Sequence, residues 1–268
     1  MGEVDWPCTV KTLFQHDNLG PMRAQIAALD WFFKEEEQGI VLEDDCLPVT
    51  SFFSFCDELL ERYKNDRRIF MISGDNFQNG RRRSDGDYYF SVYTHIWGWA
   101  AWRRTWECFD ESLTAWPDFK QIGGIESLHR AKKVRRYWKR LFDSIYSGEY
   151  GRGWDYRLLF ACWREGGLVV LPQKNMVKNI GFGRNATNCL DADSDVACLP
   201  AEEINTPLRH PSVIARSVYA DEYTSKRMFS ERTFLERVSL HARNPGNALK
   251  KLLGIMRSLR FKGGVSVG

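Results

Sequence analysis

The sequence lacks the features that mark several large classes of protein. Its 268 positions contain no run of 18 apolar residues, and the N-terminus has neither a basic start nor an apolar stretch, so we expect no membrane span and no secretory signal. No segment is repeated, which excludes solenoid folds. The seven cysteines include no CxxC pair and their number is odd, so reduced thiols in a cytoplasmic protein are the expectation.

An excess of charge of one sign is missing as well. The chain has 38 Lys and Arg against 35 Asp and Glu, a net charge of +3, so we expect no nucleic-acid partner. The exception is the stretch 231–262, with eight basic and two acidic residues. Its apolar residues share one helical face at 249–259, which predicts a basic amphipathic helix. That helix either docks on its own domain or makes a peripheral contact with anionic lipid.

Aromatic residues are abundant. The chain has 17 Phe, 10 Tyr and 10 Trp, more than a core of this size usually requires, while the apolar share of 43% and the charged share of 27% are ordinary for a globular protein. We therefore expect some of the aromatic rings to face a ligand.

Strand and helix patterns alternate along the first third of the chain. Residues 8–14, 40–42 and 69–73 have the composition of short strands, and helical patterns cover 22–37 and a segment that Thr50 is expected to cap. Helices at 130–146 and 154–164 and a strand at 168–172 follow. This alternation is typical of βαβ units, and it predicts an α/β fold with a mostly parallel sheet flanked by helices.

Three acidic residues follow the predicted strand 40–42 directly: Glu43, Asp44 and Asp45. In open α/β sheets the carboxyl ends of the strands are where ligands bind. Consecutive carboxylates repel one another unless a cation lies between them, and hard oxygen ligands suit Mn²⁺ or Mg²⁺ held together with a diphosphate. The alternative is a solvated helix cap ahead of Pro48.

Several motifs occur in an order that resembles a known family. The stretch 40–48 resembles the DxD-type metal motif of GT-A glycosyltransferases. It is followed by the sequences SGDN at 73–76, HIWGWA at 95–100, WDYR at 154–157 and NIGFG at 179–183. Over roughly residues 5–225 this string resembles a bacterial family of nucleotide-diphospho-sugar transferases, often described as hemolytic-protein-like. It is more distantly similar to Golgi N-acetylglucosaminyltransferases, which are inverting and Mn²⁺-dependent.

The resemblance implies roles for four acidic residues. Asp45 would hold the metal, Asp44 would lie near the ribose of the donor, and Glu43 would support the turn. Asp155 would be the general base that deprotonates the acceptor hydroxyl, as an inverting displacement requires. The alternative for Asp155 is a helix N-cap.

The resemblance also implies an acceptor-binding loop at Trp97, Gly98 and Trp99, because flat aromatic rings suit the apolar faces of sugars. The alternative is that these tryptophans belong to the core. We interpret His95 as a structural histidine, because no other ligand stands at metal spacing from it.

The chain departs from the family at two places. Asn188 stands where the family commonly has a histidine, and the family's opening strand, Asn-Arg-Pro-like turn, helix and second strand are not found. We therefore expect a GT-A-like domain at 1–228 that is N-terminally incomplete, followed by a basic helical tail at 229–268. The strands at 8–14 and 40–42 are expected not to pair with each other.

These observations predict a metal-dependent, inverting glycosyltransferase. It would move a sugar from a nucleotide-sugar donor to a glycan or a lipid-linked acceptor, in the cytoplasm and with possible membrane contact through the tail. Two other interpretations stay open. In the first, the chain is a degenerate, non-catalytic glycan-binding module. In the second, it is a metal-dependent phosphohydrolase that uses the same carboxylates.

Overall fold

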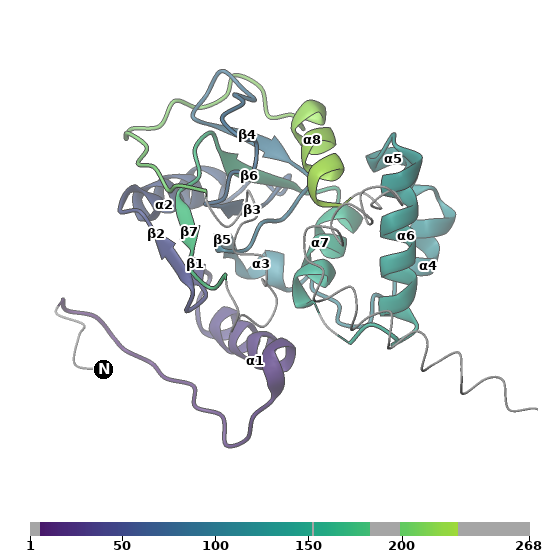
Figure 1. Cartoon of the computed structure of the whole chain (residues 1–268). Coiled ribbons are helices and arrows are strands. Elements are labelled where there is room, and N and C mark those ends of the chain that lie inside the picture. The colour runs from purple at the N-terminus through teal and green to yellow at the C-terminus, as the bar shows by residue number, and fades with distance from the viewer. Residues whose placement is uncertain (1–5, 152, 183–198, 230–268) are drawn as a thin grey trace, which may run out of the picture.

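The protein is a mixed α/β structure built around a five-stranded sheet (Figure 1). A computed structural model describes residues 6–151, 153–182 and 199–229. Its elements in chain order are α1 (Gly20–Glu35), β1 (Gln38–Leu42), β2 (Cys46–Pro48), α2 (Ser51–Tyr63), β3 (Ile69–Ser73), β4 (Tyr88–Ser91), β5 (Gly98–Trp102), α3 (Arg103–Trp106), α4 (Trp116–Gln121), α5 (Gly124–Leu128), α6 (Lys132–Tyr146), α7 (Trp154–Arg164), β6 (Leu168–Pro172), β7 (Val177–Asn179) and α8 (Val218–Met228).

The sheet has the strand order β1-β5-β3-β6-β4, and its strands are not mostly parallel, so that prediction is wrong. Only β3 and β6 are parallel neighbours; β5 is antiparallel to both β1 and β3, and β4 is antiparallel to β6. The predicted crossover from β1 through α2 to β3 does form, and these two strands run in the same direction. However, β5 is inserted between them with the opposite direction.

The strands that change the topology come from the aromatic stretch at 88–109. Every residue of β4 and β5 is buried, so neither strand alternates between apolar and polar residues. Periodicity therefore gives no signal for these strands, because a strand covered on both faces reads as a continuous apolar run.

Most of the other predicted elements are confirmed. The strands at 69–73 and 168–172 and the helix at 154–164 have the predicted bounds. Helix α1 begins and ends two residues earlier than predicted, and α6 begins two residues later. The prediction of a strand at 8–14 is wrong. This segment forms no strand, it does not pair with β1, and its side chains are exposed, Phe14 at 84%. The lack of pairing between 8–14 and 40–42 agrees with expectation.

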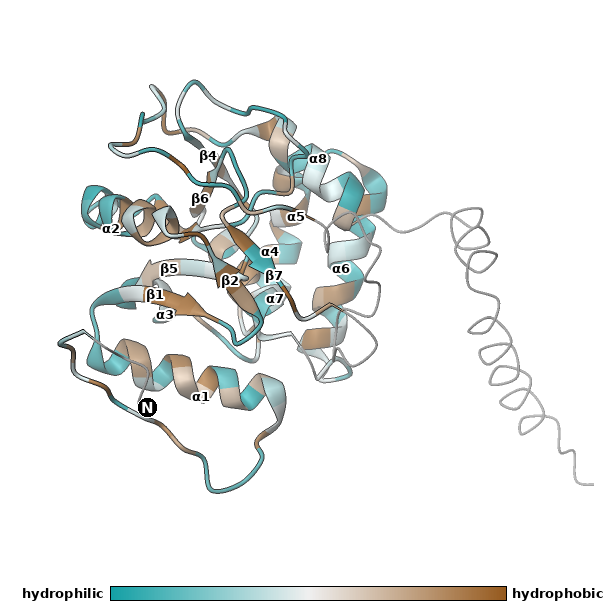
Figure 2. Ribbon diagram, turned by 60° about the vertical axis from the view of Figure 1, so that its left-hand side comes forward, coloured by the Kyte–Doolittle hydropathy of each residue, from teal (hydrophilic) through white to brown (hydrophobic). Residues whose placement is uncertain are grey.

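Helices cover both faces of the sheet. On one face, α2 packs Phe52, Phe55 and Leu59 against β3, β5 and β6. On the other face, α1, α7 and α8 contribute Phe33, Leu158 and other apolar residues to a second cluster. Figure 2 shows α2 and α1 on opposite sides of β1 and β5. The sheet is thus the middle of three layers.

A third apolar cluster lies on the far side of α7 from the sheet, where α4, α5 and α6 pack (Figure 1). Its centre is Trp138 of α6, which is fully buried and contacts Trp163 of α7 edge-on with ring centroids 4.8 Å apart. This cluster accounts for many of the aromatic residues, and it holds α7 firmly against the sheet.

A small two-stranded sheet, β2 with β7, lies beside α2. Thr50 does not cap α2 with its side chain as expected, because its backbone is already helical. Instead the Glu203 carboxylate accepts the backbone N–H groups of Thr50 at 3.2 Å and Ser51 at 2.8 Å. An acidic group at a helix N-terminus is favourable there, so the cap comes from a residue distant in sequence.

No helix in the described ranges combines the length and the apolarity needed to cross a membrane. The expected amphipathic helix at 249–259 and nearly all of the expected tail at 229–268 lie outside the described residues.

Candidate functional site

Three strands end at one edge of the sheet. Because β1, β3 and β6 run in the same direction, their carboxyl ends lie together, and β5 begins at the same edge, where Leu42 pairs with Gly98 and Ser73 pairs with Trp99. Acidic residues follow β1 and β3 here. We call this region the acidic edge and define it as Glu43, Asp44, Asp45, Asp75 and Asp155.

The turn after β1 carries three of these acids. It is closed by the Cys46 N–H, which donates to the Glu43 carbonyl at 3.1 Å. The Glu43 carboxylate accepts a 2.7 Å hydrogen bond from the side-chain amide of Gln25 on α1. Asp44 is exposed, and Asp45 is partly buried and accepts a weak bond from the Cys46 thiol at 3.4 Å. Helix α1 therefore fixes Glu43, whereas Asp44 is open to solvent.

Asp155 lies in the first turn of α7 and is not the N-cap residue, so that alternative is excluded. The N-cap is Gly153, whose φ of 78° is in the left-handed region that favours glycine. Asp155 is thus placed where the N-terminal end of the helix dipole favours a negative charge. Burial nevertheless raises the pKa of the Asp155 carboxyl group.

The acids of this edge influence one another. The pKa of Glu43 is raised to about 7, first by burial and then by the negative charges of Asp45 and Asp155. No basic side chain forms an ion pair with any of the five carboxylates within the described residues. His95 supplies no positive charge, because burial lowers its pKa to about 3. The five acids therefore have no ion-pair partner in the described part of the chain, and only backbone hydrogen bonds and the charge of Arg157 oppose the effect of burial on the pKa of Asp155. With pKa values of about 8 and about 7, Asp75 and Glu43 hold a proton for much of the time at neutral pH.

Asp75 is a residue of this site that sequence reasoning did not select. Its side chain is fully buried; one oxygen accepts the Trp97 backbone N–H at 3.1 Å, and the other has no partner among the described residues. The pKa of Asp75 is raised to about 8, mainly by burial and to a smaller extent by the charge of Glu43. A signal was available, because Asp75 follows the fully buried strand β3 just as Glu43 follows β1.

A short segment after β7 covers Asp45. The Ile180 N–H donates to the Asp45 carbonyl at 2.8 Å, and the Gly181 N–H donates to the Asn179 side chain at 2.8 Å. Gly181 comes so close that a Cβ atom there would lie 2.0 Å from a carboxylate oxygen of Asp45. Only glycine fits at this position while the Asp45 carboxylate keeps its place.

The three predicted acceptor-binding residues have different surroundings. Trp97 is partly buried at the acidic edge, where its ring contacts Phe77 and Phe182 edge-on. Gly98 is buried, and a Cβ atom there would lie 2.8 Å from Val177. Trp99 is 1% exposed and packs in the core, so its ring presents no open face to an acceptor in this structure. Of these two tryptophans, only Trp97 lies at the acidic edge with part of its side chain exposed.

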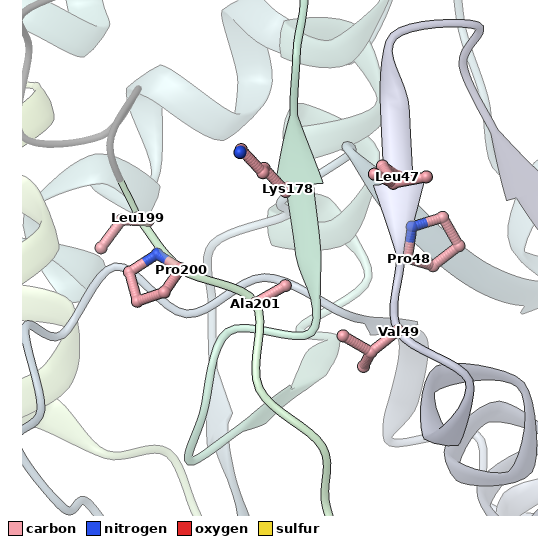
Figure 3. Close-up of a pocket in the computed structure, with 7 residues that line it drawn as sticks. All are labelled: Leu47, Pro48, Val49, Lys178, Leu199, Pro200 and Ala201. Atoms are coloured by element: carbon pink, nitrogen blue, oxygen red, sulfur yellow. The ribbon is translucent and has the colours of Figure 1, made fainter.

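A hollow of about 580 Å³ opens on the outer side of the small sheet (Figure 3). Leu47 and Lys178, which are paired across β2 and β7, project into it. The remaining lining residues are apolar: Pro48, Val49, Leu199, Pro200 and Ala201. Among the described residues no carboxylate lines this hollow, so it differs in chemistry from the acidic edge, even though Asp45 directly precedes β2.

The acidic edge has the chemistry of a site for a hard divalent cation, since crowded carboxylate oxygens are the ligands that Mn²⁺ and Mg²⁺ prefer. Within the described ranges, no three His, Cys, Asp or Glu side chains converge as a ready-made metal cage. A cation held here by one protein carboxylate would need further oxygen ligands from phosphate and water.

Comparison of the chain with protein-family models gives no match, and comparison with curated proteins gives none either.

Proposed function

We propose that the protein is a glycosyltransferase that moves a sugar from a nucleoside-diphosphate donor to a glycan or lipid-linked acceptor, with inversion and with Mn²⁺ or Mg²⁺. The observation that carries this proposal is the acidic edge itself, where five carboxylates from three separate parts of the chain gather without an ion pair among the described residues. Strongly perturbed carboxyl groups at the carboxyl ends of strands are typical of functional sites.

The donor would bind at the turn after β1. Asp45 is the proposed protein ligand of the cation, and exposed Asp44 is within reach of a ribose hydroxyl. When bound, the cation supplies Lewis acidity that stabilises the negative charge of the departing diphosphate. Glu43, with its pKa near 7 and its bond to Gln25, holds a proton part of the time and so limits the repulsion within the turn.

Asp155 is the proposed general base. Its carboxylate takes the proton of the acceptor hydroxyl while that oxygen forms a bond to the anomeric carbon. The bond from this carbon to the diphosphate breaks, and its electron pair leaves with the diphosphate. A raised pKa suits this role, because a more basic carboxylate binds the transferred proton more tightly. Trp97, with Phe182 beside it, is the proposed platform for the acceptor sugar.

The test is turnover. The protein is incubated with a panel of UDP- and GDP-sugars, Mn²⁺ and mixed glycan acceptors, and the released nucleoside diphosphate is quantified. Asp155→Asn is expected to lower acceptor-dependent release at least 100-fold while Mn²⁺-dependent nucleotide binding is retained. Asp45→Ala is expected to lose both, and Asp57→Asn on the exposed face of α2 is the matched control.

The two other interpretations have distinct outcomes in this assay. Release that does not depend on any acceptor indicates a phosphohydrolase. Glycan binding without nucleotide binding indicates a non-catalytic glycan-binding module. Either result contradicts the proposed transferase.

A further inference from the structure

Three consecutive arginines lie in the loop that joins β3 to β4, and they do not share one role. The Arg82 guanidinium donates to the backbone carbonyls of Ser84 at 3.1 Å, Asp85 at 3.1 Å and Gly86 at 2.8 Å. Its donors are therefore used to hold its own loop in shape. Arg81 and Arg83 project elsewhere, to Tyr223 of α8.

Tyr223 is surrounded by guanidinium groups. The Cζ atoms of Arg81, Arg83 and Arg227 lie 4.3 Å, 5.5 Å and 5.9 Å from the centre of its ring, all within the range of a cation–π interaction. Arg227 also donates to the Tyr223 hydroxyl at 2.8 Å. We call Arg81, Arg83 and Tyr223 the arginine cluster.

Arg83 is fixed by a second contact. Its Nε donates to the side-chain carbonyl of buried Gln78 at 2.8 Å, and the Gln78 amide in turn donates to Thr224 at 2.9 Å. The terminal guanidinium nitrogens of Arg83 and the whole guanidinium of Arg81 form no hydrogen bond or ion pair within the described residues. The cluster therefore presents fixed donors that are still unused.

Neither Arg81 nor Arg83 forms an ion pair with a carboxylate in the described part of the chain. Glu222, the neighbour of Tyr223 in sequence, lies 4.0 Å from the side chain of Arg130 instead. Like charges held together repel, and an anion between them relieves the repulsion. A planar guanidinium matches two oxygens of a phosphate, and stacking on the ring reduces the entropy lost on binding.

The cluster adjoins the acidic edge. Gln78, which holds Arg83, follows Asp75 by three residues in the same loop. Burial raises the pKa of Tyr89 most, the charges of Asp221 and Asp75 raise it further, and the charge of Arg83 lowers it. The Tyr89 hydroxyl group therefore lies within electrostatic reach of both Arg83 and Asp75. An anion bound at the cluster would therefore be close to a molecule bound at the acidic edge.

We propose that Arg81 and Arg83, stacked on Tyr223, form an anion site for a phosphate group that the acceptor carries. The assignment to the acceptor rests on the proposed function, whereas the anion site itself does not.

The test is a titration of inorganic phosphate in EDTA, followed by the side-chain Nε–Hε resonances of ¹⁵N-labelled protein. The Arg81 and Arg83 signals are expected to shift and saturate, and Arg81→Gln is expected to weaken the affinity at least fivefold. Arg67→Gln, an exposed arginine at the opposite end of β3, is the control and should leave the affinity unchanged. Arg81→Lys keeps the charge and should recover only part of the affinity.

A lack of saturation, or equal phosphate affinity in Arg81→Gln and in the unaltered protein, overturns the anion site. Titrations with glucose 1-phosphate and with phosphatidylcholine vesicles containing phosphatidic acid separate a soluble phosphate from a lipid-linked one. Saturation by either supports the acceptor assignment, and saturation by neither overturns it. Binding of UDP with Mn²⁺ is measured in parallel, so that failure of the donor site and failure of the arginine cluster are distinguished.

Discussion

Asp221 and Asp75 are both buried carboxylates, yet their surroundings differ in one decisive respect. The two oxygens of Asp221 are bound to the Ser91 hydroxyl and the Arg216 guanidinium, and this contact ties α8 to β4. Asp75 has one backbone partner and one oxygen without a partner among the described residues. A buried polar group is normally satisfied, so the contrast separates an acid whose two oxygens hold the fold together from an acid with one unsatisfied oxygen at the acidic edge.

The largest expected effect is on the free energy of unfolding, and it follows from substituting Asp221, whose two oxygens both have partners. Asp221→Asn leaves the Arg216 charge without its partner, and the free energy of unfolding should fall by about 3 kcal/mol. Asp75→Asn keeps an acceptor for the Trp97 N–H and removes a poorly solvated acid, so it should cost less than about 1 kcal/mol. Urea denaturation at pH 7 measures both. Equal losses in the two variants would contradict the contrast.

The second effect is the pH dependence of stability. A carboxyl group whose pKa is higher in the folded protein than in the unfolded chain binds its proton more tightly when folded. The raised pKa of Asp75, about 8, therefore predicts that the folded state loses stability as the pH rises from about 4 to about 8, and Glu43 adds to this loss up to about pH 7. Over this range the free energy of unfolding should fall by at least about 2 kcal/mol.

Urea denaturation at a series of pH values measures this loss. Asp75→Asn should flatten the profile, whereas Asp57→Asn should leave its slope as it is. A profile that rises over the same range in the unaltered protein is the opposite of what the Asp75 surroundings predict.

The third effect concerns ligand binding with little change in stability. Gly181→Ala brings a methyl group against the Asp45 carboxylate and should weaken Mn²⁺-dependent nucleotide binding at least tenfold, a loss of about 1.4 kcal/mol. Gly151→Ala is the matched control, because nothing lies within 4 Å of a Cβ atom there. Calorimetric titration with Mn²⁺ and nucleotide measures the affinity of both variants. An unchanged affinity in Gly181→Ala would show that Asp45 is not part of the nucleotide-binding site.

The smallest expected effect comes from the hydrogen bond between Gln25 and Glu43, which supports the turn after β1. Gln25→Ala removes the hydrogen bond to Glu43 and should lower the free energy of unfolding by about 1 kcal/mol above pH 7, where Glu43 is ionised. Below pH 6 the loss should be smaller, because a protonated Glu43 accepts this bond less strongly. A loss that does not depend on pH would show that Glu43 is not the group involved.

The sequence predicted the elements that obey simple periodicity, and it failed where burial removes the periodicity. Strand β3 and helix α7 have the predicted bounds, because strand and helix patterns mark them directly. Strand β5 was missed because all five of its residues are buried, and with it the sheet direction was mistaken. The segment 8–14 has a strand-like composition but no neighbouring strand to pair with.

The site was predictable in part for similar reasons. Glu43, Asp44 and Asp45 were identified from their place after a predicted strand, which the structure shows to be the partly buried edge strand β1. The structure brings Asp155 close enough to affect the pKa of Glu43. Asp75 also follows a strand at its carboxyl end, but it is a single acidic residue and not part of a consecutive acidic run. Trp97 is partly exposed and contacts Phe182, whereas Trp99 is buried in the core. Their spacing of two residues in the sequence does not predict this difference in exposure.

Calorimetric titration decides whether the acidic edge binds a divalent cation together with a nucleoside diphosphate. UDP and GDP are titrated into the protein and into Asp45→Ala, with and without Mn²⁺. We expect saturable binding of at least one nucleotide that requires Mn²⁺ and is lost in Asp45→Ala. Binding that needs neither Mn²⁺ nor Asp45, or no binding of either nucleotide, would contradict this expectation.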